Sequence, residues 1–181
     1  MSKELREPRV LVVYQSQTGN TKKVAKAIYD SIPEPKEIKS LKQANSLDGY
    51  SLIFLGFPIH GSGPNKEAKS YLEKNTKGKQ ISLFITHAAP VDAPEIPESL
   101  QKFRDAAGEA DIIDLFHCRG QLDKIIKLVM KFMPDPKIRE WARSDNSEGQ
   151  PDKESLEKAA LFASRIIEKE RTLNPHMRIA T

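Results

Sequence analysis

The most constraining feature of the sequence is a regular alternation between short strand-like segments and longer amphipathic segments. The strand-like segments cover residues 10–14, 37–41, 52–55, 81–85 and 112–116. Of these, 37–41 is brief and carries Lys39, which is typical of an edge strand. Apolar residues recur at helical spacing in the segments between them, such as 24–32, 65–74 and 98–107. The alternation predicts an α/β fold, a doubly wound parallel sheet with helices on both faces.

The region after the fifth strand departs from this alternation. Residues 121–133 predict an amphipathic helix with an unusually wide apolar face, on which we expect Ile125, Val129 and Phe132 to face inward. The helix would belong to an insertion at about 121–150, followed by a last helix that begins near Asp152 and a loose tail from about 173. Four roles are open for this helix. They are packing on the core, a contact between two subunits, a lid over a ligand and, less favoured, binding to a membrane surface. The 181 residues fit one domain, 1–181.

One loop joins the end of the first strand to the start of the first helix. It consists of Ser16, Gln17, Thr18, Gly19, Asn20 and Thr21. At such a junction the backbone N–H groups are unpaired and the helix dipole is positive, so the loop suits a phosphate group. Three hydroxyl side chains add donors, whereas an ordinary helix cap needs only one such residue. The loop matches neither of two familiar phosphate-binding patterns, G-x-x-x-x-G-K-[ST] and G-x-G-x-x-G.

The run S-Q-T-G-N-T resembles the (S/T)-x-T-G-N-T loop of flavodoxins. The run D-G-Y-S-L-I-F-L-G-F-P-I-H-G over 48–61 resembles the third-strand region of that family, and 86–90 matches the start of its third flavin loop. This resemblance implies the strand order 2-1-3-4-5, which the alternation alone does not select. It also implies a non-covalently bound FMN and a role in electron transfer.

The resemblance implies three FMN-binding loops in this chain. The first holds the phosphate with residues 16–21, and Ser16, Thr18, Asn20 and Thr21 would be its ligands. The other two would border the isoalloxazine ring with Pro58, Ile59, His60, Gly61, Ser62, Gly63, Thr86, His87, Ala88 and Ala89. His60 and His87 are candidate catalytic residues, because an imidazole can deliver a proton near neutral pH. Alternatively, both are polar loop residues.

The sequence also departs from flavodoxins. His60 stands where that family commonly has a tryptophan, and the third loop lacks a tyrosine, so both aromatic walls of the flavin site are missing. The chain is basic, with a net charge of +4, whereas flavodoxins are typically acidic. These departures leave two functions open. One is an electron carrier for protein partners, and the other is an FMN-dependent oxidoreductase acting on a small aromatic, quinone-like or tetrapyrrole acceptor. A third, weaker alternative is a binding module without flavin.

Composition argues against several other classes of protein. The 29 Lys and Arg residues are interleaved with 25 Asp and Glu residues, which argues against nucleic-acid binding. No apolar run approaches the roughly 20 residues of a membrane-spanning helix. Four His and one Cys without metal-ligand spacing predict no metal site. Cys118 is the one cysteine, so we expect a cytoplasmic protein without internal disulfides, in which this residue is a small buried hydrophobe.

Overall fold

The computed structural model of the protein describes residues 9–33 and 35–173. Its centre is a five-stranded parallel sheet in the order β2-β1-β3-β4-β5. The strands are β1 (Val10–Tyr14), β2 (Lys36–Ser40), β3 (Leu52–Pro58), β4 (Gln80–His87) and β5 (Asp111–Arg119). The predicted doubly wound fold, its strand order and the extra helices after β5 are confirmed.

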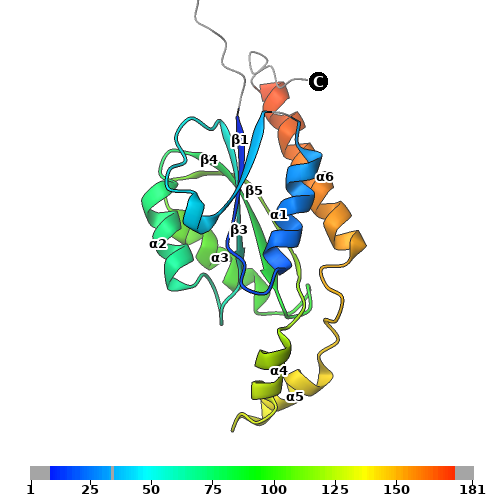
Figure 1. Cartoon of the computed structure of the whole chain (residues 1–181). Coiled ribbons are helices and arrows are strands. Elements are labelled where there is room, and N and C mark those ends of the chain that lie inside the picture. Colours follow the sequence, from blue (N-terminus) through cyan, green and yellow to red (C-terminus); the bar gives the residue numbers. More distant parts are fainter. Residues whose placement is uncertain (1–8, 34, 174–181) are drawn as a thin grey trace, which may run out of the picture.

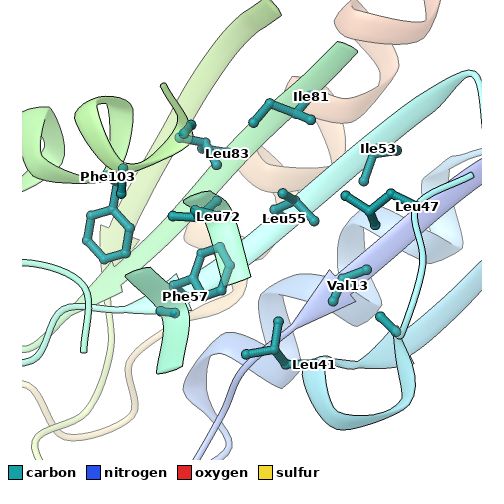
Figure 2. Close-up of a cluster of buried hydrophobic side chains, with 14 of the residues drawn as sticks. Val13, Leu41, Leu47, Ile53, Leu55, Phe57, Leu72, Ile81, Leu83 and Phe103 are labelled. Carbon is teal, nitrogen blue, oxygen red and sulfur yellow. The ribbon is translucent and has the colours of Figure 1, made fainter. Parts of the chain in front are cut away.

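Two pairs of helices cover the two faces of the sheet (Figure 1). The helices α1 (Asn20–Ser31) and α6 (Lys153–Leu173) lie on one face, and α2 (Lys66–Asn75) and α3 (Ile96–Ala107) lie on the other. Side chains alternate along each strand, so Val10 and Val12 of β1 pack toward α1 and α6. Leu11 and Val13 join the opposite cluster, which is drawn in Figure 2.

Several element boundaries differ from those predicted. The edge strand β2 ends at Ser40 rather than 41, because the side chains of Ser40 and Gln43 form a capping box around the short 3-10 helix η1 (Leu41–Gln43). The strands β3, β4 and β5 all continue further toward the carboxyl edge of the sheet. The ladder between β4 and β5 runs as far as the pair His87 and Arg119.

The chain after β5 forms two short helices, α4 (Lys124–Met130) and α5 (Pro136–Ser144), which project beyond the carboxyl edge of the sheet (Figure 1). We call residues 123–145 the helical lobe. The helix α4 is shorter than the predicted 121–133, because the Asp123 carboxylate caps it by accepting hydrogen bonds from the N–H groups of Ile125 and Ile126. The predicted tail begins at the last described residue, and the rest of it lies outside the described residues.

Candidate functional site

The loop between β1 and α1 is shaped by Gly19. This residue has φ +91°, in the left-handed region that favours glycine, and it occupies the N-cap position of α1 without capping the helix. Its N–H group donates to the Ser16 hydroxyl at 3.1 Å. A Cβ atom on Gly19 would have no heavy atom within 4 Å, so open space adjoins this part of the loop.

Thr21 and Thr86 join the first loop to the end of β4. Both side chains are buried, with exposed fractions of 1% and 2%, and their hydroxyl oxygens lie 2.8 Å apart. One hydroxyl donates to the other, so the pair retains one hydrogen for a further acceptor. Both residues line the first of the two cavities described next.

Two adjoining cavities open at the carboxyl edge of the sheet. The first, of about 120 Å³, is bordered by the β1–α1 loop and by the ends of β3 and β4. The second, of about 420 Å³, continues toward α3 and the helical lobe. The two share six lining residues, which are Ile59, His60, His87, Ala88, Leu122 and Ile126. The first cavity therefore has hydroxyl-bearing residues at one end and opens into a larger space that is lined mostly by apolar surface.

The second predicted loop is a tight turn. The backbones of His60 and Gly63 exchange hydrogen bonds of 2.9 and 3.3 Å, and Gly61 has φ +61° at the first central position of the turn. Ser62 and Gly63 line neither cavity. Instead the Ser62 hydroxyl accepts a hydrogen bond from Lys102 of α3, and a Cβ atom on Gly63 would meet the same lysine side chain.

His87, which is buried, forms an imidazole pair with the half-buried His117 beside the cavities. His87 Nδ1 lies 2.9 Å from the Ala89 carbonyl oxygen, and His87 Nε2 lies 3.0 Å from His117 Nδ1. Burial lowers the pKa of His87 to about 4 and also lowers the pKa of His117. Both rings are therefore neutral at pH 7. Since a carbonyl only accepts, His87 carries its proton on Nδ1, and His117 donates from its own Nδ1 to His87 Nε2.

The helical lobe is fastened to β5 by Asp145. This carboxylate has an exposed fraction of 3% and accepts hydrogen bonds from Lys127 of α4 at 2.8 Å and from Arg119 of β5 at 3.4 Å. Burial raises the pKa of Asp145, but the hydrogen bonds from Lys127 and Ser147 outweigh this effect and leave it below its usual value. Arg119 also donates to the Ala88 carbonyl oxygen at 3.0 Å, so the same cluster holds the loop after β4.

The comparisons with known proteins agree with this architecture. A sequence model for the family described as "Flavodoxin domain" matches residues 11–164. The chain is also 31% identical, over 170 residues, to the flavodoxin-like domain-containing protein BilS of Clostridioides difficile, with coverage of 88% of this chain and 96% of BilS. The chain belongs to the flavodoxin domain family.

Solved structures show the same fold at lower sequence identity. A WrbA-like flavodoxin from Agrobacterium tumefaciens is 16% identical with a TM-score of 0.60, and the match covers 92% of this chain and 99% of that one. Oxidised Flavodoxin 2 from Bacillus cereus is 19% identical with a TM-score of 0.58, and the match covers 89% of this chain and 99% of that one.

Most of the residues predicted from the flavodoxin resemblance meet around the two cavities. The first cavity is lined by Ser16, Gln17, Thr18, Asn20, Thr21, Pro58, Ile59, His60, Thr86, His87 and Ala88. Gly61 and Ala89 line the second. His60 is exposed, whereas His87 is buried, so the two candidate histidines stand in different environments.

Asn20 lines the first cavity, and its side chain is engaged within the protein. Its amide group donates to the Gln121 carbonyl oxygen at 2.8 Å and to the Thr18 hydroxyl at 3.2 Å, so both amide hydrogens have partners in this structure. A Cβ atom on Gly120 would come within 2.8–2.9 Å of this side chain. Asn20 therefore braces the first loop against the chain that leaves β5.

The orientation predicted for the inserted helix is wrong. Ile125, Val129 and Phe132 are 57–80% exposed. Leu122 and Ile126, on a different side of the segment, line both cavities, and Met130 lines the second. The Asp123 cap sets the residue at which α4 begins, and tertiary contacts decide which of its apolar residues face the cavities. Leu122, Ile126 and Met130 are spaced four apart, but so are Ile125, Val129 and Met133, so the spacing alone selects neither side.

Six further lining residues were missed by the sequence analysis, namely Gln121, Asp123, Glu95, Ile96, Ser99 and Trp141. His117 was missed because the fifth strand was predicted to end at residue 116, just before it, whereas β5 continues to Arg119. Cys118 is buried, as predicted, and burial raises the pKa of its thiol to about 12. Within residues 9–33 and 35–173, no three His, Cys, Asp or Glu side chains gather as a metal site, and no helix is long and apolar enough to cross a bilayer.

Proposed function

We propose that this flavodoxin-family protein binds FMN non-covalently and transfers electrons through it to a redox partner. The observation that carries the proposal is the continuity between the hydroxyl-lined first loop and the larger apolar cavity. A molecule with a terminal phosphate and a flat apolar ring matches this arrangement of donors and space. The bound flavin supplies the redox chemistry by accepting and donating electrons.

The residues of the first loop fit a phosphate group. Ser16 and Thr18 carry hydroxyl groups and line the first cavity. The helix α1 begins at the same loop, directly after Gly19, and no side chain caps its first N–H groups. The Thr21–Thr86 pair has a spare hydroxyl hydrogen close by. Lys22 and Lys23 in the first turn of α1 are exposed and line neither cavity, so neutral donors would hold the phosphate.

The test compares FMN with riboflavin, which lacks the phosphate. We expect the purified protein to quench the emission of FMN at lower concentrations than that of riboflavin. The double variant Ser16→Ala/Thr18→Ala should weaken FMN binding by about 1–3 kcal/mol, the scale of hydrogen bonds to a charged group, and leave riboflavin binding unchanged. Ser164→Ala in the distant helix α6 is the control. Equal loss of affinity for both flavins in the double variant would show that the phosphate is held elsewhere.

A second candidate is an FMN-dependent oxidoreductase that reduces a small aromatic or quinone-like acceptor. The observation in its favour is the exposed His60, which lines both cavities, since an imidazole there could exchange a proton with the reacting site. Anaerobic mixing with NADH or NADPH separates the two candidates. Rapid bleaching of the flavin followed by turnover of a quinone supports the enzyme, whereas reduction only through a reductase protein supports the carrier.

A further inference from the structure

The helical lobe places one large aromatic side chain at the second cavity. Trp141 of α5 lines this cavity together with Met130 of α4. Ile96, at the start of α3, also lines it. The exposed fraction of Trp141 is 36%, so a large part of this side chain is covered and the rest is accessible. His60 and Gly61 lie at the same cavity, in the turn where flavodoxins commonly carry an aromatic residue.

The position of Trp141 is fixed at both ends of α5. Asp135 caps the start of the helix by accepting from the Lys137 N–H group at 2.8 Å, and Pro136 occupies its first turn. Beyond its end, Asp145 joins Lys127 and Arg119 in the cluster described above. The neighbouring Ala142 is fully buried. An aromatic residue held in this way can form a rigid wall rather than a flexible flap.

We propose that Trp141 supplies the aromatic wall of the flavin site, in place of the aromatic loop residues that this chain lacks. This inference rests on the proposed function, because it assigns the second cavity to the isoalloxazine ring. A flat aromatic ring gains from stacking on indole beyond the burial of its area. The lobe inserted after β5 thus completes the binding site as well as extending the fold.

The test exploits the fact that FMN and riboflavin share their ring and differ in the phosphate. We expect Trp141→Ala to weaken the binding of both flavins by a similar factor of about 3- to 10-fold, measured by quenching of flavin emission. Trp141→Phe keeps an aromatic ring and should retain most of the affinity. Phe132→Ala is the matched control, since this residue lies just beyond α4, is 80% exposed and lines neither cavity.

Three results overturn the inference. The first is Trp141→Ala binding both flavins as tightly as the wild type. The second is a loss in Trp141→Phe as large as that in Trp141→Ala, since a structural role of indole would then explain both. The third is a wild-type protein that binds no flavin, which defeats the proposed function as well. The first result, found together with a loss of FMN affinity in Ser16→Ala/Thr18→Ala, would overturn this inference and leave the proposed function standing.

Discussion

At the scale of single residues, His87 combines a buried ring with defined proton positions. Its Nδ1–H group donates to Ala89 and its Nε2 accepts from His117. Its pKa is lowered to about 4, mainly by burial; His117 and Arg119 act in the same direction, whereas the hydrogen bond to Ala89 and the charge of Glu95 act against them. The neutral imidazole is therefore part of the folded structure.

This arrangement predicts a particular dependence of stability on pH. The unfolded chain takes up a proton on His87 near its ordinary pKa of about 6.5, whereas the folded chain does so only near pH 4. The stabilisation is complete above about pH 6.5 and is lost as the pH falls toward 4, by about 1–3 kcal/mol. Urea unfolding across this range should show a smaller loss in His87→Gln than in the wild type. The exposed His60→Gln serves as the control, and identical pH profiles for all three proteins would contradict the prediction.

Individual residues also show where sequence reasoning succeeds. The first loop could be predicted because its chemistry is local, with hydroxyl groups and a glycine between a strand and a helix. The contact of the Asn20 side chain could not be predicted, because its partner is the carbonyl of Gln121, a hundred residues further on. His87 was identified, but its partner His117 lies on the neighbouring strand, and no local signal connects the two.

At the scale of elements, the helical lobe depends on a few polar contacts with the rest of the molecule. Asp145 is the residue that both Lys127 of α4 and Arg119 of β5 contact. The apolar residues of α4 contribute less, because Ile125, Leu128 and Val129 are more than half exposed. The attachment of the lobe therefore relies more on these ion pairs than on the exposed apolar side chains of α4.

Replacing Asp145 should loosen the lobe without unfolding the sheet. In Asp145→Ala, Lys127 and Arg119 lose a buried acceptor, so we expect amide hydrogens in α4 and α5 to exchange roughly 10-fold faster or more. Amides of β1, β3 and β4 should be unaffected. Asp30→Ala is the control, because its ion pair with Lys26 is exposed and worth little. Uniform acceleration across the sheet and the lobe would show that Asp145 supports the whole fold instead.

Elements also differ in how far the sequence predicts them. The central strands β1, β3 and β4 are buried on both faces, so their continuous apolar runs identify them. The edge strand β5 is only partly buried, and its apolar sequence pattern ends before its hydrogen-bonded pairing with β4 does. The helix α4 has apolar residues on several sides, so periodicity predicts a helix without selecting its inner face. Tertiary contacts decide that face, and they also bring α5 and Trp141 to the cavity.

At the scale of the whole molecule, the lobe leaves and rejoins the body at adjacent points. The Leu122 N–H group donates to the Ser147 hydroxyl at 2.8 Å, and the Gln121 N–H group donates to the Gln150 carbonyl at 3.1 Å. Arg119 also binds the Asn146 side chain at 2.7 Å. The chain on both sides of the lobe is thus held together without it.

This closure predicts that the lobe can be removed. Deleting residues 123–145 and joining Leu122 to Asn146 through a short glycine bridge should leave a folded α/β protein, as judged by circular dichroism. We expect this variant to bind FMN and riboflavin more weakly than the full chain, because it lacks Trp141 and Met130, while the preference for FMN remains. A variant that folds and binds both flavins with full affinity would contradict this expectation, and an unfolded product would mean that the lobe stabilises the sheet.

The position of Trp141 has a practical consequence, because it is the one tryptophan in the sequence. Ultraviolet emission from indole in this protein reports on α5 alone, whereas the sheet and its flanking helices carry only tyrosine and phenylalanine. The chain thus contains a natural optical label at the mouth of the second cavity. A shift in the wavelength of this emission, recorded while the far-ultraviolet dichroism stays constant, would report a change in the surroundings of α5 over an intact sheet.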